Sequence, residues 1–394
     1  AQDSTYIFGA GDGTLQASWT TSSVKLPTPT RTGYTFKGWY KEQACTSKAG
    51  DGGANYTPTS ASVILYAKWA KNNYEQLKGT THVAYYTTAS EAMSGCTTGN
   101  TIKVLNNVTE SSGFTIPSGK TIYLELNGKT ISTKATITNS GTLYINKTST
   151  SGTISCTGGA TAISNTGSYL EAKNATITSA GMGIDATKTA VLNGLTITTT
   201  GNAVKNQSNT MTIESCTLKS DISAVNGTSG VIIINNSKVT GDYGIFNYDA
   251  TIRVHKGSTV TGTSKSGAIS YNSGGTIEIG ATSETLSSTA EVISGKQYGV
   301  FVQAGAVYLY NGKIQGETAA SYGAISVRSA CSIVETTSGN YKVKYLKSTA
   351  STTSINDSLL SLSSLSNGTK KIVGTSSFEN FISNNTKGDY NSVL

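Results

Sequence analysis

The chain has 394 residues, of which 36% are hydrophobic, and its formal net charge is +8. This length requires two or more domains or one long repetitive fold, and the low hydrophobic content excludes a single thick globular core. Only three cations are Arg (Arg31, Arg253 and Arg328), and no apolar run is long enough to cross a bilayer. We therefore expect no nucleic-acid partner and no membrane insertion. The Lys-rich surface provides solubility or, alternatively, attraction to acidic glycans.

Residues 1–70 differ in composition from the rest of the chain, since all three Trp and three of the four Pro lie there. Apolar alternation in the phrases GYTFKGWY (33–40) and LYAKW (65–69) predicts strands with one buried face. Both phrases closely resemble the Listeria–Bacteroides repeat, the internalin-type B repeat of bacterial surface proteins, over most of residues 5–70. The resemblance implies a small β-grasp-like spacer domain in an extracellular, by expectation Gram-positive, bacterial protein that is secreted or attached to the wall. The start at Ala1, without a Met or an apolar signal region, fits a mature or trimmed extracellular segment.

Residues 71–99 are interpreted as a linker followed by a capping helix. The stretch 71–80 reads as linker, and Thr88-x-x-Glu91 is a capping-box signature for a short helix that ends near Gly95. Such a helix would cover the open end of a repetitive core, which needs protection from edge-to-edge association.

From residue 100 to 345 a period of about 21 residues dominates the sequence. Small-residue–apolar–Asn steps recur, and one apolar column runs through Ile177, Ile197, Leu218, Val239 and Val260. Three short strands per period predict an all-β fold, a three-sheet parallel β-helix. This part resembles the right-handed, pectate-lyase-like β-helix family, and the right hand is expected for parallel crossovers. Residues 346–394 are expected to form a C-terminal cap and tail, with an apolar segment near Leu359.

Further columns follow from the same period. A second apolar column is predicted through Leu170, Leu192, Ile213, Ile233, Ile252, Ile277 and Leu309, and an asparagine ladder through Asn165, Asn206, Asn226, Asn247 and Asn272. The step from Val260 to Ile293 is longer, which places an exposed insertion at residues 281–290. The five scattered Cys, which lack paired spacing, are interpreted as small buried residues.

Candidate catalytic residues are few. Asp221 and Asp242 follow their apolar partners by three residues on adjacent coils, and Lys296 continues that column. Stacked carboxylates about 5 Å apart could bind Ca²⁺ or act as acid and base in cutting an acidic glycan. No metal motif is present, however, so no cofactor is expected. Nothing in the sequence orients His82 or His255, and two solvated turn carboxylates are the simpler interpretation of the Asp pair.

Candidate binding residues form a tyrosine column. Tyr243, Tyr298 and Tyr322 each precede a Gly and an apolar residue, and they border the Asp221/Asp242 column. Aligned aromatic faces beside hydrogen-bond acceptors suit the binding of sugar rings, although Tyr also fits half-exposed strands for structural reasons alone. Rows of Thr could order water as in ice-binding solenoids, but Lys219 and Lys238 interrupt them.

The sequence therefore favours a surface protein that works as a non-enzymatic adhesin or stalk binding a glycan or a host surface protein. The first alternative is a lyase or glycosidase built on Asp221, Asp242 and Lys296. The second is a purely structural spacer. The ligand, the mode of wall attachment and the oligomeric state are not fixed by the sequence.

Overall fold

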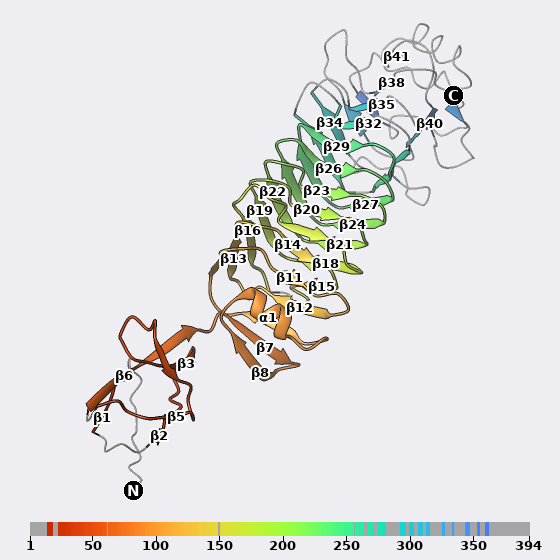
Figure 1. Ribbon diagram of the computed structural model, residues 1–394. Coiled ribbons are helices and arrows are strands. Elements are labelled where there is room, and N and C mark those ends of the chain that lie inside the picture. The colour runs from red at the N-terminus through yellow and green to blue at the C-terminus, as the bar shows by residue number, and fades with distance from the viewer. Residues whose placement is uncertain are drawn as a thin grey trace.

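The computed structural model is an elongated molecule in which a small β domain precedes a long β-solenoid (Figure 1). It describes residues 14–18, 23–60, 62–148, 150–255, 257–263, 267–271, 275–280, 292–296, 299–302, 306–309, 313–315, 325–327, 333–334, 343–346, 353–354 and 359–361. The small β domain and the last described coils of the solenoid lie at opposite ends of the molecule. The all-β fold with parallel stacked sheets that the period predicted is confirmed.

The amino-terminal domain is a small antiparallel sheet domain. Its strands are β1 (Thr14–Ser18), β2 (Val24–Lys25), β3 (Tyr34–Tyr40), β4 (Lys48–Gly50), β5 (Asn55–Tyr56) and β6 (Ser62–Lys71). They form a four-stranded sheet in the order β1-β6-β3-β4 and the pair β2-β5. Leu26, Trp39 and Leu65 make the core, and the Trp39 indole N–H donates to the carbonyl oxygen of Pro27 at 2.8 Å. The two phrases that carry the family resemblance thus supply the two central strands, β3 and β6.

The solenoid consists of three stacked sheets, which we number in the order in which each coil visits them. Sheet 1 contains β10 (Val108–Glu110), β13 (Thr130–Thr133), β16 (Thr153–Cys156), β19 (Thr176–Ser179), β22 (Thr196–Thr199), β25 (Thr217–Ser220), β28 (Lys238–Gly241), β31 (Thr259–Gly262), β34 (Val292–Gly295), β37 (Lys313–Gln315) and β42 (Leu359–Ser361). Sheet 2 contains β11 (Thr115–Ile116), β14 (Ile137–Asn139), β17 (Ile163–Asn165), β20 (Ile184–Ala186), β23 (Val204–Asn206), β26 (Ser223–Gly227), β29 (Tyr243–Asn247), β32 (Ile269–Tyr271), β35 (Val300–Val302), β38 (Ile325–Val327) and β41 (Thr353–Ser354). Sheet 3 contains β7 (Tyr74–Lys78), β8 (Thr81–Tyr86), β9 (Thr101–Val104), β12 (Thr121–Glu125), β15 (Thr142–Ile145), β18 (Tyr169–Lys173), β21 (Ala190–Asn193), β24 (Thr210–Glu214), β27 (Val231–Asn235), β30 (Thr251–Val254), β33 (Thr276–Ile279), β36 (Ala306–Leu309), β39 (Ile333–Val334) and β40 (Val343–Leu346).

Inward-facing side chains stack from coil to coil. In sheet 1 the register pairs Ile177 with Ile197, then continues through Leu218, Val239 and Val260, so the first predicted column is confirmed. All five side chains are buried in one continuous core. The step across the predicted insertion is also confirmed, because Val260 pairs with Ile293. The insertion itself, residues 281–290, lies outside the described residues.

The second apolar column was partly wrong. Leu170 pairs with Ala190 rather than with Leu192, and Ile213 pairs with Ile234 rather than with Ile233. The last step was also wrong, because Leu309 pairs with Ile279 rather than with Ile277. Ile233 is only partly buried and lies on the outer face of sheet 3, between two buried neighbours. Because side chains alternate between the two faces of a strand, an error of one residue moves a side chain from core to surface.

Tight corners connect sheet 3 to sheet 1. The corners that follow β12 through β33 contain residues with a left-handed backbone, among them Asn127, Asn146, Asn174, Gly194, Ser215, Asn236, Gly257 and Gly280. Asn and Gly tolerate this conformation better than other residues, which explains why they recur at this place. At three of these corners the residue that follows, Cys216, Ser237 or Ser258, is buried, and its side chain accepts a backbone N–H from the previous coil. Cys216 Sγ accepts from Leu195 at 3.4 Å, and Ser237 Oγ accepts from Cys216 at 3.0 Å.

The cysteines are therefore structural in this part of the fold. Cys96, Cys156 and Cys216 are buried as predicted and are free thiols, whereas Cys45 is only partly buried. Burial raises the pKa of Cys96 and of Cys216 to about 11 in each case, so both are protonated and unreactive near neutral pH.

The asparagines at the corner between sheets 2 and 3 do not form a continuous ladder. Asn139 donates to Asn165 at 2.7 Å, but Ala186 and Gly227 occupy the same column on alternate coils. The Asn165 amide instead reaches forward and donates to two carbonyl oxygens in the next turn, those of Lys188 and Thr189, each at 3.2 Å. The side chain of one Asn thus pairs with the turn carbonyl oxygens of the following coil. The matching position of that following coil can then be a small residue such as Ala186.

Two members of the predicted ladder need separate comment. Asn226 pairs with Lys205 and Phe246, so it belongs to a different column, on the outer face of sheet 2. Asn272 lies outside the described residues. The variable offset between each Asn and its apolar partner is what separated Asn226 from the others.

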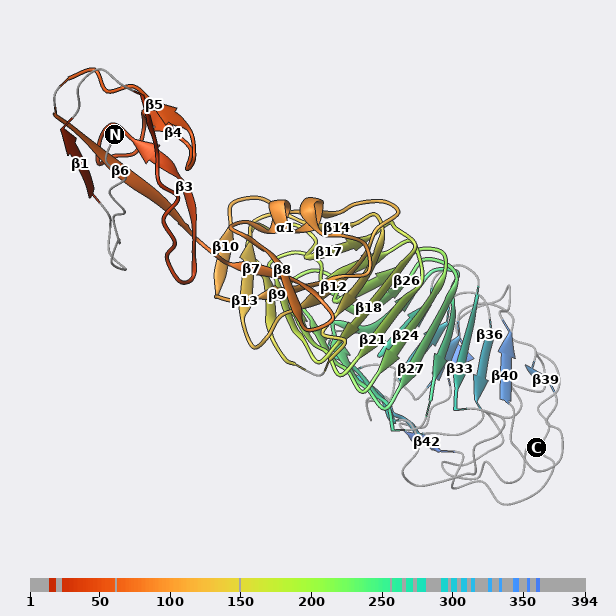
Figure 2. The ribbon, with the colours of Figure 1, turned by 90° about the horizontal axis from the view of Figure 1, so that it is seen from below.

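The N-terminal end of the solenoid is closed by α1 (Ala89–Gly95) and by the hairpin of β7 and β8 (Figure 2). The helix begins with the predicted capping box of Thr88 and Glu91, which is confirmed. Ala92 and Met93 on its inner side are fully buried in the solenoid core. The helix thus contributes apolar side chains to the end of the core, as a cap requires.

The stretch predicted as a linker is largely ordered structure. Residues 74–78 are strand β7, which pairs antiparallel with β9 and β8. Asn72 connects the two bodies. Its backbone N–H donates to Gly33 and its side chain accepts from Thr35 at 2.6 Å, while its carbonyl oxygen accepts from Asn106 of the solenoid at 2.8 Å. The prediction was wrong because a polar stretch can be a strand when a neighbouring sheet edge satisfies its backbone.

At the C-terminal end the last coil is met by antiparallel strands. β40, β41 and β42 pair with β36, β38 and β37, one in each sheet. Parallel stacking therefore ends on antiparallel strands in all three sheets at the C-terminal end and, through β7, in sheet 3 at the N-terminal end.

Candidate functional site

The two candidate carboxylates lie at the corner between sheets 1 and 2. Asp221 and Asp242 directly follow β25 and β28, whose register places these residues on adjacent coils. Both are exposed. The Asp221 N–H donates to the Thr199 carbonyl, and Asp242 Oδ1 accepts from the Thr263 hydroxyl at 3.2 Å. Each carboxylate thus belongs to a solvated turn held by its neighbouring coil.

Lys296 lies further along the same corner. It is exposed and follows β34, where Gly262 pairs with Gly295. This register places Thr263 between Asp242 and Lys296, which are two coils or roughly 9.5 Å apart along the solenoid. The three candidate catalytic residues therefore lie in one row, and only the two Asp residues are on adjacent coils.

Within the described residues there is no cluster of three or more His, Cys, Asp or Glu side chains that could hold a metal ion. His82 lies far away in β8, where, contrary to the expectation that nothing orients it, its Nδ1 is 3.0 Å from Glu75 and its ring contacts Tyr85.

An aromatic cluster lies beside Asp242 on sheet 2. Tyr243 begins β29, and its ring meets Phe246 edge to face at 5.1 Å. Phe246 in turn meets Tyr248 edge to face at 5.0 Å, and Tyr248 is 42% exposed. We call Tyr243, Phe246 and Tyr248 the aromatic cluster. Tyr298 and Tyr322, the other two members of the predicted column, lie outside the described residues.

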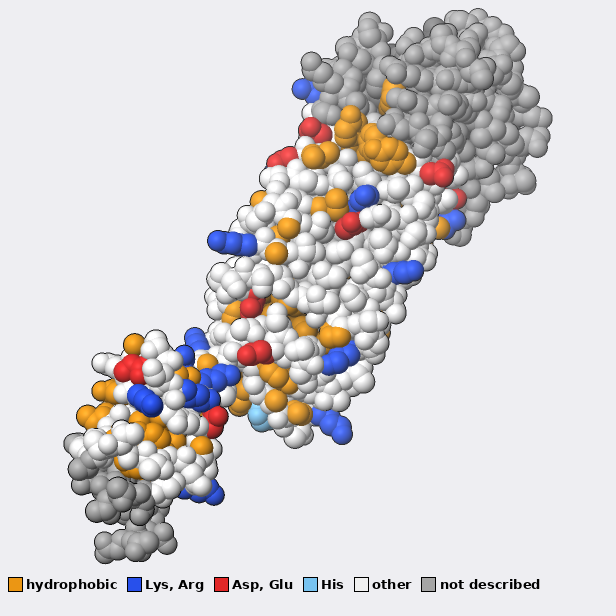
Figure 3. All heavy atoms as spheres, viewed as in Figure 1, with side chains coloured by type: hydrophobic (Ala, Val, Ile, Leu, Met, Phe, Trp, Pro, Cys, Tyr) orange, Lys and Arg blue, Asp and Glu red, His pale blue; other side chains and the backbone are white. Residues whose placement is uncertain are grey.

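The aromatic cluster is part of a larger hydrophobic surface. Ile222, next to Asp221, is 51% exposed. Figure 3 shows hydrophobic side chains gathered near the C-terminal end of the described solenoid, on the face turned to the viewer. Exposed apolar groups rimmed by polar residues mark ligand- and partner-binding surfaces. Phe246 was missed in the sequence analysis, because the predicted binding surface was made of tyrosines.

A second aromatic row, which the sequence analysis missed, lies on the outer face of sheet 3. The rings of Tyr123 and Tyr144 stack at 4.9 Å, and Tyr169 follows at 5.6 Å. The Lys147 ammonium lies over the first two rings, 4.5 Å and 5.0 Å from their centroids. Tyr123 and Tyr144 are 21 residues apart in the sequence, so the repeat period could have identified them.

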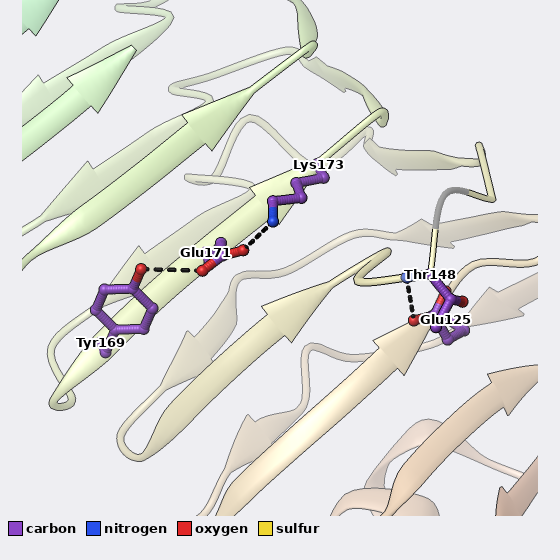
Figure 4. Close-up of polar contacts among 5 residues, drawn as sticks. All are labelled: Glu125, Thr148, Tyr169, Glu171 and Lys173. Atoms are coloured by element: carbon purple, nitrogen blue, oxygen red, sulfur yellow. Dashed lines mark hydrogen bonds and ion pairs between the residues drawn. The ribbon is translucent and has the colours of Figure 1, made fainter. Parts of the chain in front are cut away.

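Charged groups complete the row on sheet 3 (Figure 4). The Tyr169 hydroxyl donates to Glu171 at 3.0 Å, and Lys173 lies 2.5 Å from the same carboxylate. Burial opposes ionisation of Glu171, but these hydrogen bonds and charges outweigh it and lower the pKa of Glu171. Burial and the bond to Glu171 raise the pKa of Tyr169 to about 12. Every group of the row is engaged with another, so the row ties coils together.

The same face shows how the loop that carries Lys147 is held. Glu125, at the end of β12, is 6% exposed and accepts from the Thr148 N–H at 3.1 Å and the Thr150 hydroxyl at 3.0 Å (Figure 4). This carboxylate therefore has a positioning role for the loop between β15 and β16.

Sheet 1 carries the Thr rows. The register stacks Thr176, Thr196 and Thr217, and also Thr178 and Thr198, before Lys219 and Lys238 interrupt both rows as predicted. Thr is favoured on exposed strand faces in general, so the rows need no functional explanation.

Comparison with known proteins identifies one segment. Residues 7–68 match the family model of the Listeria-Bacteroides repeat domain, which confirms the resemblance seen in β3 and β6. No curated protein and no solved structure matches the chain. The repeat is typical of extracellular bacterial proteins. Among the described residues, the only helix is the short α1, and none is long and apolar enough to cross a membrane.

Proposed function

We propose that this chain is an extracellular bacterial surface protein that acts as a non-enzymatic, ligand-binding stalk or adhesin. In this proposal the amino-terminal repeat is a spacer, and the solenoid displays a binding face for a glycan or a host surface protein. The observation that carries the proposal is the aromatic cluster on sheet 2, next to Asp242 and the exposed Ile222.

The contacts of the aromatic cluster support binding. Phe246 lies between Tyr243 and Tyr248 and meets each of their rings edge to face. Adjacent aromatic rings offer a large apolar contact area to a ligand. Asp221 and Asp242, at the border of the cluster, supply hydrogen-bond acceptors, and Tyr298 and Tyr322 are proposed to extend the surface.

Several observations speak for binding rather than catalysis. Asp221 and Asp242 are both exposed, and Asp242 is hydrogen-bonded to Thr263 on the next coil. Lys296 lies one coil beyond Thr263. A catalytic acid and base need different pKa values, which come from different, partly enclosed environments around two carboxyl groups that face the same substrate. Exposed carboxylates in a row lack that arrangement. Ca²⁺ would need more oxygen ligands than this pair and Thr263 offer.

The test is a comparison of two exposed tyrosines. Tyr248→Ala should weaken binding to a glycan array or to mucin-coated surfaces by roughly tenfold, as loss of an aromatic contact predicts. Tyr85→Ala is the matched control, since Tyr85 is 46% exposed at the other end of the solenoid. Equal binding by both variants would contradict the proposed face. Turnover of pectin or alginate that Asp242→Asn abolishes would show an enzyme instead.

A further inference from the structure

One column on the outer face of sheet 2 contains polar and aromatic side chains, which alternate from Asn226 onward. The register runs from Lys205 to Asn226, then to Phe246, Ser270 and Phe301, one residue from each successive coil. Of these five residues, only Phe246 also belongs to the aromatic cluster. We call this column the axial track, because it runs along the length of the solenoid.

Two members of the axial track have hydrogen-bonding groups without partners. Asn226 is 8% exposed and Ser270 is 2% exposed, yet Asn226 Oδ1 and Ser270 Oγ are buried and make no hydrogen bond. Buried polar groups are nearly always paired, because an unpaired one loses its hydrogen bonds to water without replacement. Two such atoms in one short column therefore indicate a surface that is completed by something else.

The aromatic members lie on either side of Ser270. Phe246 and Phe301 are both partly exposed and are two coils apart, roughly 9.5 Å from strand spacing. This spacing is close to the span of a disaccharide unit in an extended polysaccharide chain. The polar residues then fall between the rings, where the hydroxyl groups of such a chain would lie.

We propose that the axial track binds a linear, β-linked, uncharged polysaccharide that lies parallel to the solenoid axis. Phe246 and Phe301 contact the faces of alternate sugar rings, and Asn226 and Ser270 exchange hydrogen bonds with hydroxyl groups. This inference rests on the proposed binding function and names the class of ligand. An extended chain is required because successive coils present one residue each in a straight row.

The chemistry of the track favours a sugar over an apolar protein partner. A protein side chain that covered the rings with hydrocarbon would leave Asn226 Oδ1 and Ser270 Oγ unpaired, whereas a polyhydroxylated ligand supplies donors and acceptors at every ring. Lys205 is the single charged residue of the track, which is too few for a regularly charged polymer.

Binding requires a small rearrangement. Because Asn226 Oδ1 and Ser270 Oγ are covered in the free protein, the rings beside them must turn before a ligand can reach them. Phe246 contacts both Tyr243 and Tyr248, so its rotation would change the environment of two tyrosines. A ligand-induced change in tyrosine absorbance is therefore expected.

The experiment uses the full chain and titrates it calorimetrically with cellohexaose, chitohexaose and mannohexaose, with maltohexaose and cellobiose as controls. We expect at least one β-linked hexaose to bind, and the α-linked hexaose and the disaccharide to bind at least tenfold more weakly. Phe246→Ala and Asn226→Leu should each weaken binding at least tenfold. Ile233→Ala, which removes a comparable outward side chain from sheet 3, should leave binding unchanged.

A second measurement separates a ligand-binding role from a structural one. Asn226→Leu and Ser270→Ala each remove an unpaired buried atom, so the melting temperature should rise while affinity falls. A falling melting temperature with Asn226→Leu would show that the amide is structural and would overturn the inference.

The remaining outcomes also decide. A hexaose that binds Phe246→Ala and Asn226→Leu as tightly as the unmodified chain refutes the track but leaves the proposed binding function standing. The same holds if every hexaose fails while the chain still adheres to a host surface protein through Tyr248. Failure of both hexaose binding and Tyr248-dependent adhesion refutes both proposals.

Discussion

Two asparagines in one buried column should respond very differently to the same substitution. Asn165 and Asn206 are both fully buried at the corner between sheets 2 and 3, with Ala186 between them in the register. We predict that Asn165→Ala is strongly destabilising and that Asn206→Ala is not. Ala186 already occupies this column one coil away, so the difference arises from hydrogen bonds rather than from space.

The magnitude follows from the bonds that each side chain makes. Asn165 accepts from Asn139 and donates to the carbonyl oxygens of Lys188 and Thr189. At about 1 kcal/mol for each bond, its loss should lower the free energy of unfolding by about 3 kcal/mol. Asn206 also donates to turn carbonyls, but its Oδ1 is buried and unpaired. Removing that atom offsets the lost bonds, so Asn206→Ala should cost about 1 kcal/mol or less.

The assay is urea unfolding followed by far-UV circular dichroism, combined with hydrogen exchange of the backbone amides. A solenoid is stabilised mainly by contacts between neighbouring coils, so the exchange data should place the loss from Asn165→Ala in the coil that contains Ala186. Equal loss of stability in the two variants would refute the reasoning, because it would mean that packing and not hydrogen bonding decides the column.

Three further results are expected. The hydrogen bond from the Thr87 side chain, with those from nearby backbone N–H groups, lowers the pKa of Glu91 in the folded protein. This carboxylate therefore stabilises the fold at pH values above its unfolded pKa, and the contribution is lost as the pH falls through the lower folded pKa. Acid unfolding of Glu91→Gln should show a weaker pH dependence than that of the unmodified chain. Burial raises the pKa of the Cys216 thiol to about 11, so this thiol should resist alkylation at pH 8 until the chain unfolds, whereas the partly buried Cys45 should react in the folded protein. Alkylation followed by mass spectrometry measures the labelling of both residues. Rapid labelling of Cys216 in the folded protein would contradict the structure. Asn72→Ala removes the hydrogen-bond acceptor of the Thr35 hydroxyl at the junction between the amino-terminal domain and the solenoid. Small-angle X-ray scattering should then detect a wider range of distances between the two domains. An unchanged scattering profile would mean that the backbone connection from β6 to β7 is enough to hold the two domains in place.

The sequence predicted those parts of the fold in which spacing is regular. The column from Ile177 to Val260 could be found because each coil in this stretch has nearly the same length. The capping box could be found because its signature is local. The column of sheet 3 failed at Leu192, which pairs with Ala172, and at Ile233, because a run of apolar residues does not show which of them face the core and a shift of one residue exchanges inside and outside.

The junction and the asparagines show a second limit, which is that hydrogen-bond partners lie in other coils. Nothing local shows that β7 pairs with β9, so residues 74–78 read as a polar linker. The alternation of Asn165 with Ala186 also makes sense only once the forward bond to the next turn is visible. The register between coils can be inferred from the repeat period. The period does not show to which neighbouring coil a side chain donates its hydrogen bonds.

The same limit explains why the candidate site was only partly found. The sequence identified Tyr243 and Asp242 from their places in the repeat, whereas Asn226 was assigned to the wrong column. Its burial without a partner becomes meaningful only beside Phe246 on the outer face. The property that points to a ligand is an unpaired atom, and pairing is a property of the folded chain.

The two aromatic surfaces of the solenoid illustrate how pairing separates structure from function. On sheet 3 the Tyr169 hydroxyl, Glu171 and Lys173 satisfy one another, and Lys147 lies over the rings beside them. A ligand would have to displace bonds that already exist, and each displaced charge would need a new partner. On sheet 2 the rings of the aromatic cluster adjoin Asn226, whose Oδ1 has no partner to lose. A hydroxyl group that reaches this amide therefore gains a bond without breaking one. This difference is why we propose sheet 2 as the binding face, although sheet 3 has the more extensive aromatic row.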